Sequence, residues 1–225
     1  MSRQLFDDWP EQYNRWFETP IGALVKHYEE KLVLDLLQPR SNELILDVGC
    51  GTGLFTRSVI AHGSVIVGLD VSEPMLRSAR RGLSTTRFWP VLADMLVLPF
   101  ADDRFDKTLS ITALEFVKDA GSAIDELFRV TRPKGRVVIA TLNSLSPWAK
   151  RRRAEASRKD KSVFEHAFFR SPDQLRKLIP VEGMVKTAVH FEKDADPARA
   201  GAIEHAGQQA GSDAGAFLIG CWQKP

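Results

Sequence analysis

The sequence is poor in cysteine and has no long apolar run. Its two cysteines, Cys50 and Cys221, are far apart and show no metal-ligand spacing. No stretch approaches the roughly 18 to 20 apolar residues that are needed to cross a bilayer. The beginning of the sequence also lacks the apolar core of a signal peptide. We therefore expect a soluble, cytoplasmic protein with no metal site and no membrane insertion.

The sequence also lacks a strong net charge. Its 225 residues carry a formal charge of +2 at pH 7, which does not favour a nucleic-acid partner. Apolar residues make up 44% and charged residues 27%, and these fractions are ordinary for a globular protein. A chain of this length suits one large domain, so residues 1–225 are predicted to form a single domain.

Apolar segments alternate with helical patterns over the first two thirds of the chain. Thr19 and Pro20 mark a helix start, as N-cap and first helical residue. Strands that alternate with helices at this spacing indicate an α/β fold with a mostly parallel sheet. The expected strands of this part are Glu43–Val48, Val65–Leu69, Arg87–Leu92, Phe105–Ile111 and Val137–Ala140. Pro90 cannot donate to a strand ladder, so the third strand should lie at a sheet edge.

The regular alternation ends after Leu142. We predict a helical cap at 1–40, a cofactor-binding core at 41–142, a substrate lid at 143–170, and a C-terminal helix with closing strands at 171–225. Glu192–Gly215 is rich in glycine and alanine, and we expect a loop there with at most one weak helical turn. The basic run Lys150–Lys161 is interrupted by acids and is interpreted as a solvated lid helix, with contact to an anionic substrate as the alternative.

A glycine-rich bend follows the first strand and carries the strongest functional signal. Gly49, Gly51 and Gly53 remove side chains where a ligand would approach the backbone. A helix that begins here would point its amide groups at the same place. Asp47 can accept a hydrogen bond from a ligand ammonium group. Asp70 ends the next strand and suits the vicinal hydroxyls of a ribose.

The bend does not match the dinucleotide fingerprint. That fingerprint needs G-x-G-x-x-G, with pyrophosphate on the helix N-terminus. Counted from Gly49, Leu54 stands in the third glycine position, and counted from Gly51, Thr56 does. An NAD-dependent oxidoreductase is therefore disfavoured, although it stays an alternative.

Several blocks in a continuous order resemble class I S-adenosylmethionine-dependent methyltransferases, in particular the ubiquinone/menaquinone-methyltransferase-like ("type 11") subgroup. The similar blocks are Leu46–Gly53 (motif I), Val67–Leu76, Ala93–Met95 with Leu98–Phe100, Arg104–Asp106, and Leu127–Gly135. The resemblance covers roughly Glu43 to Asn143. The aromatic lead-in Phe6, Tyr13, Trp16 and Phe17 is similar to that subgroup as well.

The resemblance implies a Rossmann-like class I methyltransferase fold: a mostly parallel seven-stranded sheet, helices on both faces and an antiparallel last strand. It implies S-adenosyl-L-methionine as the cofactor. The implied cofactor-binding residues are Tyr13, Asp47, Gly49, Cys50, Gly51, Gly53, Asp70, Val71, Met75, Asp94, Met95 and Thr112. Among them, Asp70 would bind the ribose, and Asp94 and Met95 would surround the adenine. Thr112 would lie beneath the methionine part, and Tyr13 would lie over the cofactor from the N-terminal helix.

Catalysis is expected to come chiefly from positioning, because the sulfonium methyl group is already activated. A base is needed only if the acceptor must lose a proton, and His166 and Glu115 are the candidates. The alternative for His166 is a lid residue packed by aromatic neighbours. The subgroup often shows Glu-His after the fourth strand, but here Phe116 follows Glu115. Cys50 is interpreted as a small packed side chain rather than a nucleophile.

We therefore predict an enzyme that transfers a methyl group to a small-molecule acceptor by in-line displacement. The alternatives are a non-catalytic S-adenosylmethionine-binding module, an RNA methyltransferase that uses the basic segment 150–161, and the NAD-dependent oxidoreductase. The sequence leaves the acceptor open among quinone precursors, other aromatics, thiols, amines and carboxylates, and it leaves the oligomeric state open.

Overall fold

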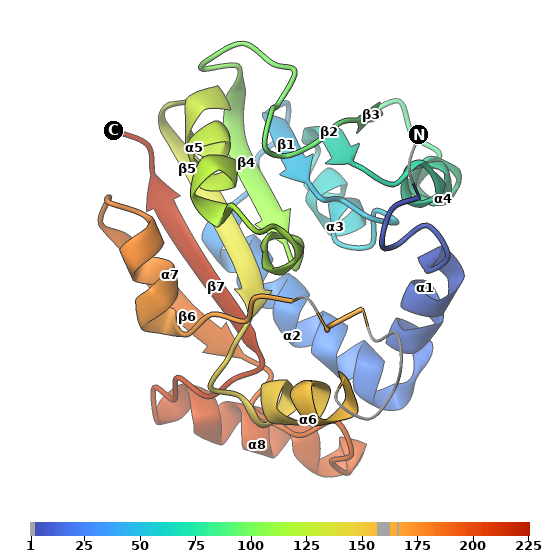
Figure 1. Cartoon of the computed structure of the whole chain (residues 1–225), viewed down its shortest axis with the longest axis vertical. Helices are drawn as coiled ribbons and strands as arrows, with labels where there is room; N and C mark the ends of the chain where they lie inside the picture. Colours follow the sequence, from blue (N-terminus) through green and yellow to red (C-terminus); the bar gives the residue numbers. More distant parts are fainter. Residues whose placement is uncertain (1–2, 157–162, 166) are drawn as a thin grey trace.

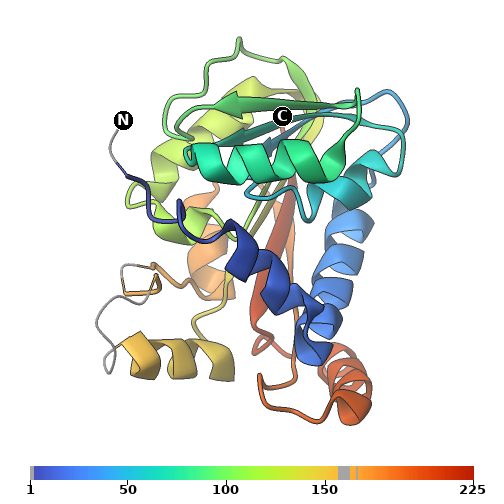
Figure 2. The same cartoon turned by 90° about the vertical axis from the view of Figure 1, so that its right-hand side faces the viewer.

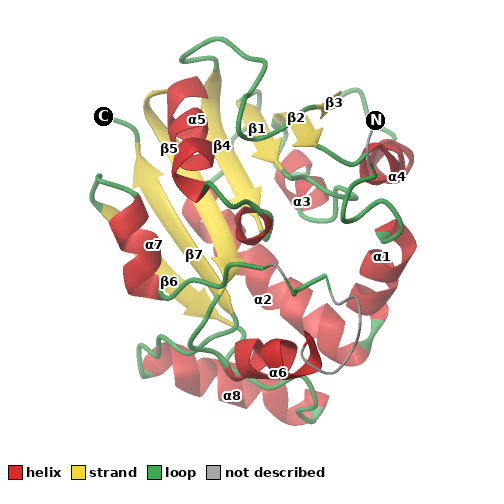
Figure 3. Ribbon diagram, in the orientation of Figure 1, coloured by secondary structure: helices red, strands yellow, loops and turns green. Residues whose placement is uncertain are grey.

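The computed structural model describes residues 3–156, 163–165 and 167–225. Within this part of the chain, seven strands form one sheet in the order β3-β2-β1-β4-β5-β7-β6 (Figure 3). The strands are β1 (Leu44–Val48), β2 (Val65–Asp70), β3 (Phe88–Leu92), β4 (Phe105–Ile111), β5 (Thr131–Leu142), β6 (Gly183–Ala188) and β7 (Phe217–Gln223). Pairs from β3 to β5 are parallel, and β7 is antiparallel to both of its neighbours. The predicted fold class is confirmed.

Eight described α-helices surround the sheet (Figures 1 and 2). They are α1 (Pro10–Glu18), α2 (Pro20–Leu37), α3 (Thr56–Ile60), α4 (Glu73–Leu83), α5 (Ala120–Val130), α6 (Pro147–Ala156), α7 (Pro172–Leu178) and α8 (Pro197–Gln209), with a short 3-10 turn η1 at Leu114–Phe116. The predicted start of α2 is confirmed, because the Thr19 side chain accepts a hydrogen bond from the Gly22 N–H at 3.1 Å. None of the described helices is long and apolar enough to span a membrane.

The core lies on both faces of the sheet because side chains alternate along each strand. In β1, Ile45 packs in the cluster that holds α2, α3, α4 and α8, whereas Leu46 packs in the cluster that holds α5 and α7. Pro90 lies in β3, which pairs only with β2 and forms one edge of the sheet. The edge position predicted from this proline is therefore confirmed.

Two local predictions are wrong. Residues 192–215 contain the 13-residue helix α8 rather than a loop. Asp196 caps α8 by accepting a hydrogen bond from the Ala198 N–H at 3.0 Å, and Ala200 is fully buried, so small residues here allow close packing. Strand β5 begins at Thr131, several residues before the predicted start.

Candidate functional site

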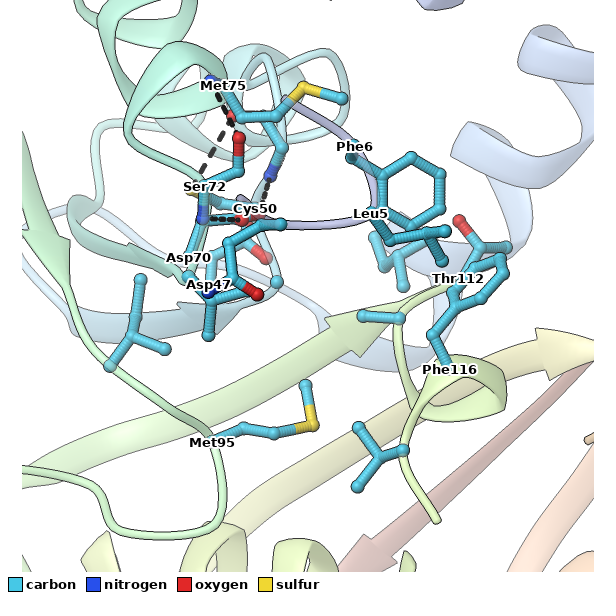
Figure 4. Close-up of a pocket in the computed structure, with 18 of the residues that line it drawn as sticks. Leu5, Phe6, Asp47, Cys50, Asp70, Ser72, Met75, Met95, Thr112 and Phe116 are labelled. Carbon is cyan, nitrogen blue, oxygen red and sulfur yellow. Dashed lines mark hydrogen bonds between the residues drawn. The ribbon is translucent and has the colours of Figure 1, made fainter. Parts of the chain in front are cut away.

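A cavity of about 360 Å³ opens at the carboxyl ends of β1, β2 and β4 (Figure 4). This edge is where open α/β sheets bind ligands, and the volume is in the range of small-molecule sites, roughly 300 to 1,000 Å³. The N-terminal segment Gln4–Phe6 and Tyr13 of α1 also contribute to its lining. Figure 4 shows the acidic side chains and Ser72 on one side of the cavity, with Phe6, Thr112 and Phe116 across from them.

The cavity brings together eleven of the twelve residues predicted to bind the cofactor. They are Tyr13, Asp47, Gly49, Cys50, Gly51, Asp70, Val71, Met75, Asp94, Met95 and Thr112. Gly53 is not among the lining residues. Its φ is +76°, and an added Cβ would lie 2.8 Å from the side chain of Leu83, so this glycine allows α4 to pack closely.

The two glycines that line the cavity have different reasons to be glycine. At Gly49, φ is +75° and an added Cβ would collide with the Ala113 side chain at 2.3 Å. At Gly51, φ is +54° but an added Cβ would meet no atom within 4 Å. Gly49 is therefore required by packing, whereas Gly51 leaves backbone open to a ligand.

The amide groups of the glycine bend are used inside the protein. The N–H groups of Gly49 and Cys50 donate to the Leu69 carbonyl at 2.7 and 3.0 Å, and the Gly51 N–H donates to Oδ2 of Asp70 at 2.9 Å. The helix expected to begin at this bend starts only at Thr56. The prediction that helix amides face the ligand is therefore wrong. A pyrophosphate would have to displace these hydrogen bonds, so the bend does not suit a dinucleotide.

Asp70 ends β2 with its carboxylate fixed from two sides. Oδ2 accepts the Gly51 N–H, and Oδ1 accepts the Ser72 N–H at 2.9 Å. Burial raises the pKa of Asp70, while these backbone hydrogen bonds oppose the rise. A carboxylate has about four lone-pair sites, so the two hydroxyls of a ribose can still be accepted. The Ser72 hydroxyl donates to Asp7 at 2.7 Å, which ties the N-terminal segment to this edge of the cavity.

Asp47 lies beneath the glycine bend and is almost completely buried. Its Oδ2 accepts a hydrogen bond from the Thr56 hydroxyl at 2.6 Å. Burial raises the pKa of Asp47 to about 7, and the Thr56 hydrogen bond counteracts part of that rise. Asp47 thus helps to hold the bend and also reaches the cavity.

Part of the cavity lining is apolar. Met75 and Met95 are buried and lie on opposite sides of the cavity (Figure 4), and Val71 and Leu96 also contribute to the lining. Asp94 is exposed, and its Oδ1 accepts the Leu96 N–H at 3.0 Å, which shapes the turn after β3. Flexible thioethers adapt to a flat ring, so this lining fits an adenine.

Cys50 is buried and lines the cavity as a free thiol. Burial raises its pKa well above the usual value, and the charges of Asp47 and Asp70 add to the rise. A thiol kept protonated in this way is a poor nucleophile. Its interpretation as a small packed side chain is consistent with this environment.

Thr112 and Tyr13 form another part of the cavity wall. Thr112 follows β4 with φ at +49°, which is unusual for a β-branched residue and marks local backbone strain. Burial raises the pKa of Tyr13 far above its usual value, and a hydrogen bond with the Thr112 side chain only partly opposes this. The Tyr13 hydroxyl therefore stays protonated at neutral pH.

Only one of the two residues predicted as candidate bases lies in the described part of the chain. Glu115 is fully buried in η1 and is not part of the cavity lining. Its Oε2 accepts a hydrogen bond from the Thr141 hydroxyl at 3.2 Å, and burial raises its pKa to about 7. His166 lies outside the described residues.

One buried acid was not predicted from the sequence. Glu29 of α2 is 7% exposed, and burial raises its pKa to about 8. It lies between the buried residues Val25 and Val33 at a spacing of four, so it stands on the apolar face of the helix. The signal in the sequence that could have revealed Glu29 is a single acid on an otherwise apolar helix face. Phe116 was also missed as a lining residue, and it contacts Phe6 with 4.8 Å between ring centroids.

The central part of the chain is similar to known methyltransferases. Residues 46–139 match the family model described as a methyltransferase domain. The chain is 38% identical over 122 residues to malonyl-[acyl-carrier protein] O-methyltransferase of Pseudescherichia vulneris, a match that covers 54% of this chain and 48% of that protein. It is 32% identical over 145 residues to demethylmenaquinone methyltransferase of Beutenbergia cavernae, covering 64% and 59%.

The fold is also found in solved structures. A SAM-dependent methyltransferase from Thermotoga maritima superposes with a TM-score of 0.73 at 20% identity, covering 98% of both chains. The chain spans about half the length of the curated relatives it matches. The ordered sequence blocks and these matches show that the central part of the chain is similar to methyltransferases, and the strand order and the superposition show that it has the fold of a SAM-dependent methyltransferase.

Proposed function

We propose that this protein transfers a methyl group from S-adenosylmethionine to a small-molecule acceptor. The observation that carries the proposal is the carboxylate of Asp70, fixed by the glycine bend at the edge of a cavity of about 360 Å³. An acid in this position suits a ribose, and the apolar side chains of Met75 and Met95 in the lining suit an adenine. The other cofactor-binding assignments made above belong to this proposal.

The chain's own residues would act by binding and orientation. When bound, S-adenosylmethionine supplies a methyl group already activated on a sulfonium. Asp70 would hold the ribose, and the open backbone at Gly51 would allow close approach of the methionine part. Tyr13 and Thr112 would form the wall next to the reacting end. Fixing two reactants in line and excluding water accounts for much of such a rate enhancement.

The remaining assignments follow from the same arrangement. Residues 1–40 would cover the cavity, 41–142 would bind the cofactor, and 171–225 would complete the sheet. Residues 143–170, of which 157–162 and 166 lie outside the described residues, would close over the acceptor. The two free thiols are consistent with the proposed cytoplasmic location. The amides used within the glycine bend oppose an NAD-dependent oxidoreductase.

The experiment compares ligands and then measures turnover. Isothermal titration should show binding of S-adenosylhomocysteine and no binding of NAD, and the reverse result would refute the proposal. S-adenosylhomocysteine release should then be followed with a panel of small amines, alcohols, thiols and carboxylic acids. Release with one of these classes indicates an enzyme, whereas binding without release under any condition favours a non-catalytic binding module.

A further inference from the structure

His190 follows β6 and is enclosed by α8 and by the loop after that helix. Its side chain is 6% exposed. An added Cβ at Gly207 of α8 would lie 2.3 Å from the imidazole, so the ring packs directly against the helix backbone. This histidine is therefore an internal group, and the partners of its two ring nitrogens determine its protonation state.

Both ring nitrogens of His190 face hydrogen-bond acceptors. Nδ1 lies 3.2 Å from Oε2 of Glu204. Nε2 lies 3.2 Å from the Ser212 carbonyl and 3.2 Å from Oγ1 of Thr187. The Thr187 hydroxyl donates its own proton to the Ser212 carbonyl at 2.6 Å, so it presents lone pairs to His190. A neutral imidazole has one N–H donor and these surroundings need two, which only the imidazolium ion provides.

The electrostatics agree with this geometry. The hydrogen bond to Glu204 raises the pKa of His190, and burial only partly opposes the rise. Burial raises the pKa of Glu204, but its contacts with His190 outweigh burial and the net shift is downward. Within the described residues, Glu204 of α8 is the charged group that acts on the ring, while β6 and the loop after α8 contribute the neutral Thr187 and Ser212.

The backbone next to His190 is strained. Val189 has a φ of +64°, which is unusual for a β-branched residue. The following N–H, that of His190, donates to Oε2 of Glu204 at 2.6 Å. One carboxylate thus holds both the backbone and the ring of His190, and it keeps this turn in its strained conformation.

A first connection joins this turn to α6. The buried indole N–H of Trp148 in α6 donates at 2.7 Å to the carbonyl of Phe191, the residue after His190. The same indole lies 6.2 Å from the ring of Trp16 in α1, measured between centroids. Helix α1 also carries Tyr13, which lines the cavity. The turn at His190 is therefore connected to α6 and, through it, to a helix of the cavity wall.

A second connection runs through Asn143, which follows β5 and precedes α6. Its fully buried amide donates to the carbonyls of Asp213 and Gly215 at 2.6 and 2.7 Å. These carbonyls belong to the loop that His190 contacts at Ser212. In Figures 1 and 2, α6 and α8 lie at the same end of the molecule. The chain around α6 is thus held at two points by the surroundings of one histidine.

We propose that the protonated His190 ring is a pH-dependent switch that anchors α6 to the turn after β6 and to the loop after α8. A neutral ring that keeps its proton on Nδ1 turns a lone pair of Nε2 toward the Ser212 carbonyl. The single proton of Thr187 can then satisfy Nε2 or Ser212 but not both, and the unpaired buried atom costs free energy. The loop and the turn separate more often as a result, and α6 loses its anchor.

The sign of the pH dependence follows from the raised pKa of His190. The contacts are complete below about pH 6.5, the ordinary value for histidine, and they are lost as pH rises through the higher value in the folded protein. Helix α6 belongs to the segment that the proposed function assigns to the acceptor. The switch would therefore make acceptor binding depend on pH, and this one consequence rests on the proposed function.

Hydrogen–deuterium exchange at the amides of residues 143–150 tests the switch in the ligand-free protein, so its result does not depend on the proposed function. The protection factors, which are corrected for the exchange rate of an unfolded chain at each pH, should fall about tenfold or more between about pH 6 and about pH 9. Protection in β1 and β4 should change less, because the opening is local. Nitrogen NMR of the His190 ring should show both nitrogens protonated at neutral pH.

Two variants isolate the histidine. His190→Gln cannot titrate, so protection of residues 143–150 should be low and no longer depend on His190 titration. His205→Gln removes an exposed histidine of the same helix, α8, and should keep the wild-type pH profile. The wild-type measurements stand alone if His190→Gln fails to fold.

Three results would overturn the inference. The first is a neutral His190 ring at pH 7 in the wild-type protein. The second is protection of residues 143–150 that is constant over this pH range or falls in parallel with that of β1 and β4. The third is a folded His190→Gln variant that keeps the wild-type pH profile.

Discussion

Two buried glutamates in this protein have opposite surroundings. Glu204 of α8 is 1% exposed, and its Oε2 accepts the His190 N–H at 2.6 Å and the imidazole Nδ1 at 3.2 Å. Its Oε1 accepts a hydrogen bond from Gln208 at 2.8 Å. Glu115 is equally buried, yet one of its oxygens has no partner in the described structure. Burial alone therefore does not distinguish the two side chains, but their hydrogen-bond partners do.

The difference appears in the pKa directions. Burial raises the pKa of Glu204, but hydrogen bonds and the charge of His190 outweigh it and the net shift is downward. For Glu115, burial dominates and the pKa rises to about 7. A carboxylate that is fully paired stabilises the fold, whereas a buried one that lacks a donor carries an unpaired oxygen that costs free energy. Four predictions test this distinction.

The largest effect is expected from Glu204→Ala. The buried N–H and imidazole of His190 would lose their acceptor, so the free energy of unfolding should fall by about 3 kcal/mol or more. Urea denaturation measures this change. S-adenosylhomocysteine affinity, measured where the variant is folded, should stay at the wild-type value. A loss of affinity with no loss of stability would show that the pair does not have a structural role.

Asp70→Ala should mainly affect the cofactor. Two hydrogen bonds from ribose hydroxyls to a carboxylate would be lost, so S-adenosylhomocysteine should bind about 100-fold more weakly, or about 2.7 kcal/mol. Isothermal titration measures the affinity. Asp94→Ala provides a comparison, because Asp94 is exposed and should contribute less. Unchanged affinity in Asp70→Ala would rule out the ribose assignment.

The pH dependence of the free energy of unfolding should reveal the raised pKa values of Glu29 and Glu115. Carboxyl groups whose pKa rises on folding bind protons more tightly in the native state, so stability is lost as pH increases from about 4.5 through 7 and 8. Between pH 5 and 6.5 the unfolding free energy should fall by about 1 kcal/mol or more. A Glu29→Gln and Glu115→Gln double variant should show a shallower fall.

Other titratable groups also affect the free energy of unfolding, each in a pH range that the direction of its pKa shift sets. Tyr13 and Arg170 keep their protonation states there, while Asp47 adds to the fall because its pKa is also raised. The raised pKa of His190 removes stability only above about 6.5, and the lowered pKa of Glu204 does so only below about 4.5. An equally steep fall in the double variant would show that the two acids are not the source.

The smallest effect on stability is expected from Glu115→Gln. This substitution removes a buried charge and keeps the shape, so the free energy of unfolding should stay within about 1 kcal/mol of wild type or rise. Thermal and urea unfolding measure it, with Glu204→Gln as the matched variant that should lose stability. A large loss of stability in Glu115→Gln would show that Glu115 has a structural role like that of Glu204.

The sequence allowed prediction of features that depend on near neighbours along the chain. Gly49, Gly51 and Asp70 lie in a bend and at a strand end, and local pattern was enough to place them together. Helix α8 was missed because its glycine and alanine content is typical of loops, whereas contacts with distant elements, such as the burial of Ala200 and the pairing of Glu204 with His190, hold it in place. The relation of Glu29 to Glu115 depends on distant elements, which no local pattern reports.

The N-terminal part of the chain both contacts the glycine bend and α4 and lines the cavity. The Thr52 hydroxyl donates to the Asn14 side chain at 2.7 Å, and Ser72 donates to Asp7, so the segment is held to the glycine bend and to α4. The same segment places Phe6 and Tyr13 in the cavity wall. Departure of the spent cofactor therefore requires these polar contacts to break. The turnover rate is then expected to depend on how fast this short segment lifts, and not on the chemical step alone.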